Sequence, residues 1–158
     1  MENRKKIESS PIEITLRWLL GALFVYAGVA KALDPAAFAS DIANYQLLPW
    51  TLCAAMACYL PWLEIIAGAA LISEKWSSAS VRILLLLMLL FFQALLTAWL
   101  RGLNIHCGCF GRALTSSNYP LLFLRDAAIF MGLGWIFFQQ WKRRIAKEEI
   151  VDPAPPGL

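Results

Sequence analysis

The feature that most constrains the fold is the run from Val81 to Leu100, which is dominated by leucine and phenylalanine. Arg82 is the one charged residue in this run, and Gln93 and Thr97 are its strongly polar members. A helix of this length would be about 30 Å long, which is close to the thickness of the hydrocarbon core of a bilayer. The run therefore predicts a membrane-spanning helix.

Three further apolar segments have similar lengths, and they run from about Ile12 to Leu33, Leu47 to Ile72 and Tyr119 to Gln140. The composition agrees, since 59% of the residues are hydrophobic and 16% are charged. Soluble domains are roughly 45–50% apolar and about 25% charged. We therefore predict an all-α integral membrane protein, built as a bundle of four transmembrane helices.

The connections between these segments define the predicted domain organisation. Asp34-Pro35 ends the first span, and the mildly amphipathic stretch Ala36–Leu48 is predicted to lie along the membrane interface as a short helix. The four-helix membrane domain covers residues 12–141. Residues 1–11 form a basic cytoplasmic tail, and residues 142–158 form a second cytoplasmic tail whose prolines favour partial disorder.

The first span has one alternative interpretation, a cleaved signal peptide, because a basic start and a short apolar region precede Ala30-Lys31-Ala32. Snorkelling of Arg17 and Lys31 would extend the usable span to roughly 20 residues, so we expect a retained helix. Arg17, Gly21, Gly28 and Lys31 recur at helical spacing and share one face. Small and charged residues on one face favour a side that packs against the bundle, with both glycines as packing sites.

An uneven distribution of lysine and arginine predicts the orientation. With four spans, both chain ends lie on one side, and ten of the 14 basic residues fall there. These are Arg4, Lys5, Lys6, Arg17, Lys75, Arg82, Lys142, Arg143, Arg144 and Lys147, against Lys31, Arg101, Arg112 and Arg125 on the other side. Because cytoplasmic segments carry the excess of positive charge, we predict a multi-pass protein of the bacterial inner (plasma) membrane. Both termini would be cytoplasmic, and the segment between the last two spans would be periplasmic.

Charged residues within the spans are expected to face the bundle interior and to pair, because a lone charge in hydrocarbon is costly. Arg17 and Glu64 fall in the cytoplasmic half of the bundle, whereas Lys31 and Asp126 fall in the outer half. From these depths we predict the ion pairs Arg17–Glu64 and Lys31–Asp126. In the functional alternative, Glu64 or Asp126 handles protons beside a quinone; structural pairing is the favoured interpretation.

The segment between the last two spans carries the most distinctive chemistry. The string His106-Cys107-Gly108-Cys109 holds the only histidine and two of the four cysteines. A Cys107–Cys109 disulfide would close a small ring, and departures from preferred disulfide geometry make such a bond easier to reduce. His106 and the nearby arginines favour the thiolate, which is the nucleophile in thiol–disulfide exchange. Cys107, Cys109 and His106 are therefore the candidate catalytic residues.

Two alternatives remain for these cysteines. With His106 they could ligate a soft metal such as Cu(I), Zn or Hg, but the sequence has no second Cys/His cluster to complete a closed site, and we predict no resident metal. The pair could also stay unused, although free thiols rarely persist in an oxidising compartment. Cys53 and Cys58 are interpreted as small buried apolar residues, with a second redox station as the alternative.

Several strings match one known pattern: Cys107-Gly108-Cys109-Phe110-Gly111, Leu60-Pro61-Trp62-Leu63-Glu64, Arg17 with Gly28 and Lys31, Asp34-Pro35, Phe38, Tyr45 and Leu48-Pro49. From roughly Ile12 to Trp141, the chain resembles the methylamine-utilisation MauE family, within the broader DoxX-like group of four-helix membrane proteins. The resemblance implies thiol redox chemistry outside the cytoplasm, linked to maturation of disulfide-rich periplasmic enzymes such as methylamine dehydrogenase, alongside a thioredoxin-like partner. It also implies that Cys107 and Cys109 are the redox pair.

Three functions fit these features. The favoured one is a thiol–disulfide oxidoreductase that exchanges with a thioredoxin-like or exported protein, requires no cofactor, and has a membrane quinone as a candidate electron carrier. The second is a non-catalytic accessory subunit of a larger membrane complex, in which the disulfide only stiffens the loop. The third is a soft-metal carrier. The lipid bilayer is an expected partner, whereas nucleic acid is not, because the sequence lacks a basic stripe with interleaved aromatics.

Overall fold

The computed structural model describes residues 11–73, 76–102 and 119–151, and within them it contains five helices and no strand. The helices are α1 (Pro11–Leu33), α2 (Pro35–Asn44), α3 (Trp50–Ile72), α4 (Ser77–Leu100) and α5 (Tyr119–Val151). Within the same residues, four stretches are long and apolar enough to cross a membrane: Pro11–Leu33, Trp50–Ile72, Ser77–Leu100 and Pro120–Ile145. The predicted all-α bundle, with a short helix after the first span, is confirmed. The chain is a multi-pass membrane protein.

The connection between α2 and α3 is longer than the sequence pattern predicts. α2 ends at Asn44 rather than at Leu48, and α3 begins at Trp50 rather than at Leu47. Gln46 adopts a left-handed backbone conformation with a φ of 53°, which no residue of a right-handed helix can have. This single residue therefore interrupts the apolar stretch and separates the two helices.

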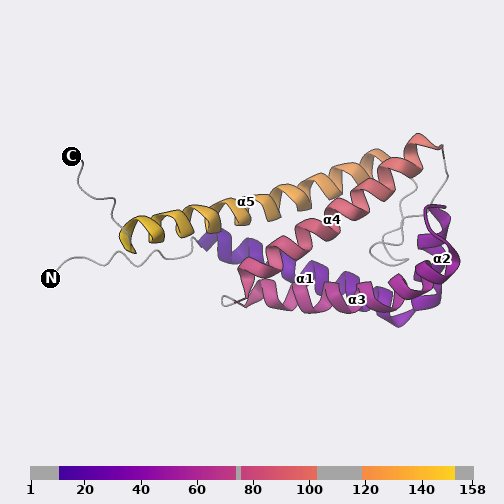
Figure 1. Cartoon of the computed structure of the whole chain (residues 1–158), viewed down its shortest axis with the longest axis horizontal. Coiled ribbons are helices and arrows are strands. Elements are labelled where there is room, and N and C mark those ends of the chain that lie inside the picture. Colours follow the sequence, from indigo (N-terminus) through magenta and orange to yellow (C-terminus); the bar gives the residue numbers. More distant parts are fainter. Residues whose placement is uncertain (1–10, 74–75, 103–118, 152–158) are drawn as a thin grey trace.

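Successive long helices run antiparallel, so the bundle has two distinct ends (Figure 1). The start of α1 and the end of α5 lie at one end, here called the termini end, and α2 lies at the other, the α2 end. α1 packs chiefly against α3 and α4 packs against α5, while contacts of α3 with α4 and of α1 with α5 join the two pairs. α5 continues to Val151, beyond the predicted end near Gln140, through lysine, arginine, glutamate and alanine, all favourable helix formers.

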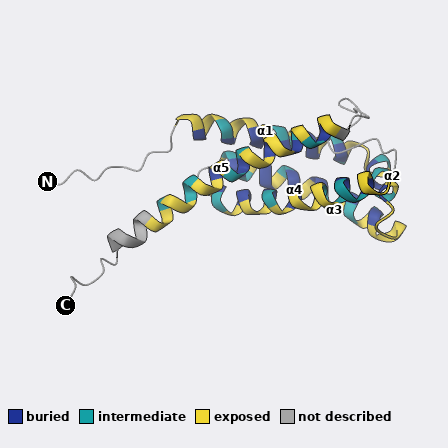
Figure 2. Ribbon diagram, turned by 90° about the horizontal axis from the view of Figure 1, so that it is seen from above, coloured by how far each residue is buried: buried dark blue, intermediate teal, exposed yellow. Residues whose placement is uncertain are grey.

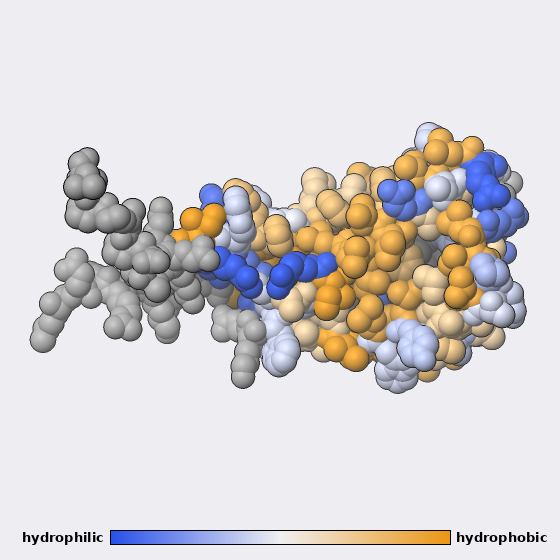
Figure 3. All heavy atoms as spheres, viewed as in Figure 1, coloured by the Kyte–Doolittle hydropathy of each residue, from blue (hydrophilic) through white to orange (hydrophobic). Residues whose placement is uncertain are grey.

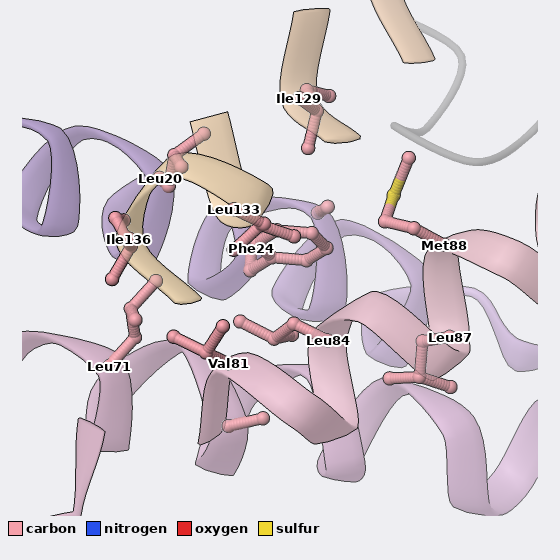
Figure 4. Close-up of a cluster of buried hydrophobic side chains, with 12 residues drawn as sticks. Leu20, Phe24, Leu71, Val81, Leu84, Leu87, Met88, Ile129, Leu133 and Ile136 are labelled. Atoms are coloured by element: carbon pink, nitrogen blue, oxygen red, sulfur yellow. The ribbon is translucent and has the colours of Figure 1, made fainter. Parts of the chain in front are cut away.

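A hydrophobic core joins all four long helices (Figure 4). Its buried members are Leu20, Phe24, Ala27, Ala67, Leu71, Val81, Leu84, Leu87, Met88, Ile129, Leu133 and Ile136. A smaller cluster of Phe38, Ala39 and Ala57 fastens α2 to α3. The core therefore ties the bundle together, and the separate α2 cluster holds the short helix across one end.

Glycines let α1 and α3 approach each other closely. A Cβ added at Gly28 would lie 2.7 Å from the carbonyl oxygen of Pro61, and one added at Gly68 would lie 2.8 Å from that of Gly21. Small residues permit such backbone contact between membrane helices. The predicted packing role of Gly21 and Gly28 is confirmed.

The outward faces of the helices carry large apolar side chains (Figures 2 and 3). Only 28–39% of the residues in the four spanning stretches are buried inside the bundle. Exposed examples are Trp18, Leu19, Trp62, Leu86 and Met131. An apolar surface of this extent suits a lipid environment, since soluble monomers rarely expose large contiguous apolar patches.

Candidate functional site

Four charged side chains from three helices gather in the interior, and we call them the charge cluster. They are Lys31 of α1, Glu64 of α3, and Arg125 and Asp126 of α5. Together they line a small cavity of about 20 Å³. Two positive and two negative groups give the cluster no formal net charge, which is the arrangement expected for ionisable groups inside a membrane.

Lys31 and Glu64 form the most buried ion pair of the cluster. Lys31 Nζ lies 2.6 Å from Glu64 Oε1 and 2.7 Å from Oε2, and each side chain is 2% exposed. The same ammonium lies 5.3 Å from the ring centroid of Phe38 and 4.8 Å from that of Phe91. Aromatic faces attract cations, so these rings add to the stabilisation by the carboxylate.

The predicted pair Arg17–Glu64 is wrong. Arg17 Nε donates to the carbonyl oxygen of Leu71 at 3.0 Å, and Nη2 donates to that of Ile72 at 3.2 Å. These carbonyls belong to the last turn of α3, where backbone acceptors lack partners within the helix. Arg17 therefore caps α3, because a cation is favourable at the negative end of a helix dipole.

The direction of the side chains explains the error. Gly28 lies between the levels of Pro61 and Ile65, so Lys31 is roughly four residues, or about 6 Å, closer to the α2 end than Glu64. Side chains on a helix lean toward their own N-terminus. Because α1 and α3 are antiparallel, Lys31 and Glu64 lean toward each other, whereas Arg17 leans toward the termini end. The sequence prediction compared only the membrane depths of the residues, so it could not include the directions in which the Lys31 and Glu64 side chains lean.

The predicted pair Lys31–Asp126 is also wrong, although both residues line the same small cavity. Asp126 Oδ1 accepts hydrogen bonds from Arg125, at 2.9 Å from Nε and 2.8 Å from Nη2. The guanidinium folds back on its sequence neighbour, and this satisfies Asp126 locally while Lys31 is held by Glu64. The expected shared depth of Lys31 and Asp126 was correct, but Lys31 pairs with Glu64 and Asp126 pairs with Arg125.

The sequence pattern missed a further buried pair. Glu13, which is fully buried, accepts hydrogen bonds from Arg143 of α5. Glu13 lies four residues before Arg17, on the same face of α1, and this spacing was the available signal. The pair joins the two chain-terminal helices at the termini end.

The two cysteines of α3 lie in different environments. Cys53 is buried, with its Sγ 3.7 Å from the carbonyl oxygen of Leu48, whereas Cys58 is exposed. Both are free thiols. Five residues separate them, so they point roughly 140° apart around the helix. The burial expected for both therefore holds for Cys53 and is wrong for Cys58. A redox role for either remains a prediction.

The cysteine pair Cys107 and Cys109, with His106, lies outside the described residues. The flanking helices are described, and both meet the connection at the α2 end (Figure 1). There Arg101 Nη1 donates to the carbonyl oxygens of Tyr45 and Gln46, at 3.4 and 3.2 Å. This contact ties the end of α4 to the α2–α3 connection.

Comparisons with known proteins agree with one another. The family model described as Methylamine utilisation protein MauE matches residues 9–139. A Methylamine utilization protein MauE from Methylophilus methylotrophus is 31% identical over 121 residues, covering 73% of this chain and 64% of the relative, which is less than two thirds of its length. One from Methylorubrum extorquens is 29% identical over 133 residues, covering 81% of this chain and 72% of the relative. No solved structure matches. Since the matched residues include α1 to α4 and most of the apolar part of α5, the chain belongs to the MauE family.

Proposed function

We propose that this protein is a membrane thiol–disulfide redox protein whose Cys107–Cys109 pair exchanges disulfides with a thioredoxin-like or exported partner. The observation that carries the proposal is the Cys-Gly-Cys string, which stands between two spanning helices of a MauE-family chain. Two thiols this close in sequence, next to a histidine, favour reversible exchange over a purely structural bond.

The distribution of charge supports a location for this chemistry. The termini end carries Arg17, Arg82, Arg143 and Arg144, and the sequence adds basic residues in both tails. By the positive-inside rule, this end faces the cytoplasm of a bacterial inner membrane. The α2 end and the cysteine pair then face the periplasm, where disulfides persist.

The exchange conserves atoms and electrons. A thiolate of one dithiol attacks a sulfur of the other protein's disulfide, a mixed disulfide forms, and the second thiolate resolves it. Two electrons and two protons thus pass between the Cys107–Cys109 pair and its partner. A quinone could reoxidise the dithiol by taking the same two electrons and two protons, becoming a quinol.

The names of the relatives suggest a physiological context. Both are called methylamine utilization proteins. We therefore propose that the exported partner of this chain takes part in the use of methylamine or a related amine, and that the exchange serves its disulfide bonds.

Trapping tests the proposal directly. In a Cys109→Ser variant, a partner protein should remain attached to Cys107 as a mixed disulfide that a reductant releases. Cys58→Ser, which removes an exposed thiol on a helix, is the matched control and should trap no partner, because Cys109 remains to resolve the mixed disulfide.

Two results would contradict thiol exchange. A Cys107–Cys109 potential below about −300 mV with no trapped partner would indicate a structural disulfide and an accessory subunit. Copper or zinc that copurifies with the protein, and is lost in both Cys107→Ser and Cys109→Ser, would indicate a soft-metal carrier.

A further inference from the structure

A pocket of about 270 Å³ lies beside the end of α3, next to the cap that Arg17 forms there. It is lined by Ile14, Arg17 and Trp18 of α1 and by Ile72 of α3. Ile14 and Trp18 belong to the exposed apolar surface, so the pocket is reached from the side of the bundle. Arg17 and Trp18 are the lining residues whose side chains carry polar groups, and both are hydrogen-bond donors. In the described part of the chain, the pocket therefore offers a positive charge and no acidic side chain.

The positive charge of Arg17 has no carboxylate counter-ion among the described residues. Lys31, Arg125 and Arg143, the cations of the three ion pairs given above, each lie against a carboxylate. Arg17 instead meets the two backbone carbonyl groups of its cap. The end of a helix carries only about half an elementary charge. The cap therefore leaves part of the guanidinium charge uncompensated.

Part of the hydrogen-bonding capacity of Arg17 is also unused. A guanidinium can donate from each of its nitrogen atoms, and the bonds to described residues come from Nε and Nη2. Nη1 makes none with these residues. The fully shielded side-chain atom without a partner among them is Gln140 Oε1, and Nη1 is not such an atom. Nη1 therefore remains accessible, and the pocket is the space that Arg17 lines.

The pocket lies at the level of the membrane interface. α3 ends at Ile72, whose carbonyl group Arg17 caps, so the guanidinium lies where this span leaves the bilayer. Trp18 beside it and Trp76, just before α4, are 59% and 63% exposed. Tryptophan is enriched at the level of the lipid headgroups. Arg17 therefore reaches the depth at which phospholipid phosphate groups lie.

We propose that this pocket binds the phosphate group of an anionic phospholipid, with Arg17 as its charge partner and Trp18 as a second donor. Hydrogen bonds between a guanidinium and a phosphate are charge-assisted and are among the strong ones. Basic pockets between membrane helices bind anionic headgroups on the cytoplasmic side, which is the side proposed for the termini end. The phosphate would supply the counter-charge that Arg17 lacks, and the acyl chains would lie along the exposed apolar face of α1.

A dissolved anion is a poorer occupant than a lipid. Ile14 and Ile72 form apolar walls, and the outward face of α1 continues with large apolar side chains such as Leu19. A small anion would lose water and gain nothing from these walls. A lipid already lies there and brings its own apolar chains. This binding is independent of the proposed thiol exchange, because it uses neither Cys107 nor Cys109.

Native mass spectrometry of the full chain would measure the binding. The protein is released from micelles of an uncharged detergent, to which phosphatidylglycerol or phosphatidylcholine with identical acyl chains has been added. We expect phosphatidylglycerol to bind about tenfold more tightly than phosphatidylcholine, which is the effect of roughly one charge-assisted hydrogen bond. An excess of glycerol 3-phosphate, which lacks acyl chains, should not displace the lipid.

The chain offers a matched pair of charge variants. Ile14 lines the pocket one helical turn before Arg17, so the carboxylate of Ile14→Glu can pair with the guanidinium and take the place of the phosphate. Ile12 is also exposed but does not line the pocket. Ile14→Glu should therefore reduce the affinity for phosphatidylglycerol about tenfold, whereas Ile12→Glu, which adds the same charge, should leave it unchanged. Arg17→Gln should abolish the preference for phosphatidylglycerol.

The two glutamate variants decide the question even if Arg17→Gln, which also removes the cap of α3, does not fold. The basic tails attract anionic lipids in general, but they are the same in all variants. Equal binding of the two lipids, or equal affinity of the two glutamate variants for phosphatidylglycerol, would overturn the proposal. Displacement by glycerol 3-phosphate would identify a site for soluble anions and would overturn it as well. Failure here would leave thiol exchange untouched, and failure to trap a partner on Cys107 would leave the lipid site untouched.

Discussion

Lys31 and Glu64 show how a single ion pair can connect two membrane helices. Their charged atoms are 2.6–2.7 Å apart, and both side chains are almost wholly shielded. In such a place, a charge that loses its partner has no water to replace it. The contribution of the pair to the free energy of unfolding is therefore best measured by removing one member and then both.

Lys31→Met should destabilise the bundle by about 3–5 kcal/mol, because Glu64 would be left buried without a counter-ion. The double variant Lys31→Met, Glu64→Leu should recover much of this loss, since no unpaired charge remains. Denaturant titration of the purified protein in mixed micelles would measure both. Lys142→Met, which removes an exposed lysine that lies over Phe138, is the control. A double variant no more stable than Lys31→Met would contradict the pairing argument.

Glu64→Gln separates a structural role from proton transfer. The amide retains the shape and can still accept a hydrogen bond from Lys31, but it cannot carry a proton away. On the favoured structural interpretation, folded Glu64→Gln protein should exchange disulfides at the unaltered rate. A stopped-flow thiol–disulfide assay on correctly folded protein would decide, and lost turnover with retained folding would show that Glu64 takes part in the chemistry.

At the scale of helices, α1 and α3 are held together by both glycines and charges. Gly21, Gly28 and Gly68 allow backbone contact, Arg17 caps the end of α3, and the Lys31–Glu64 pair lies closer to the α2 end. Backbone contact brings the helix axes close enough for short side chains and carbonyl groups to meet. These two helices therefore form the more closely packed half of the bundle, against which α4 and α5 pack.

Gly68→Ala should force α1 away from α3, because the new Cβ would lie 2.8 Å from the carbonyl oxygen of Gly21. We expect a loss of about 1–3 kcal/mol, typical of overpacking in a close-packed interior. Gly134→Ala is the matched control, since in the described residues no atom beyond its chain neighbours and its own helix backbone lies within 4 Å of its added Cβ. It should be neutral or slightly stabilising, because alanine favours helix more than glycine does. Thermal unfolding monitored by circular dichroism would measure the stability of both variants. Equal stabilities would show that the contact between Gly68 and Gly21 is unimportant.

At the scale of the whole molecule, the two ends differ in their polar contacts. At the termini end, Glu13 pairs with Arg143, and Gln140 Nε2 donates to Ser77 Oγ at 2.7 Å. At the α2 end, Arg101 holds the α2–α3 connection. The connection that carries the cysteine pair leaves and re-enters the bundle at the α2 end.

Labelling from outside the cell would test the proposed orientation. In a chain with Cys53→Ala, Cys58→Ala and Cys109→Ser, a membrane-impermeant maleimide should react with Cys107 in intact spheroplasts. With Lys147→Cys as the single cysteine instead, reaction should require a permeabilised membrane, because the basic termini end is expected in the cytoplasm. The reverse pattern would invert the orientation and place the redox pair in a reducing compartment.

The sequence alone was sufficient to predict the number and approximate positions of the spans. The length of an apolar segment is a local property of the sequence, and it must match the thickness of the hydrocarbon core. It also identified Arg17, Lys31, Glu64 and Asp126 as interior charges, and Gly21 and Gly28 as packing sites, since helical spacing places them on shared faces. The chemistry of Cys107 and Cys109 likewise was inferred from residue types and spacing, and that inference remains a prediction.

Only the tertiary structure decided which charges meet. The choice of Glu64 for Lys31 depends on antiparallel helices whose side chains lean toward each other, and the Glu13–Arg143 pair joins residues 130 positions apart. The pocket beside Arg17 is likewise lined by residues of α1 and α3 that are far apart in the sequence. Such contacts depend on the relative rotation and offset of whole helices, and a local pattern of residues contains neither quantity.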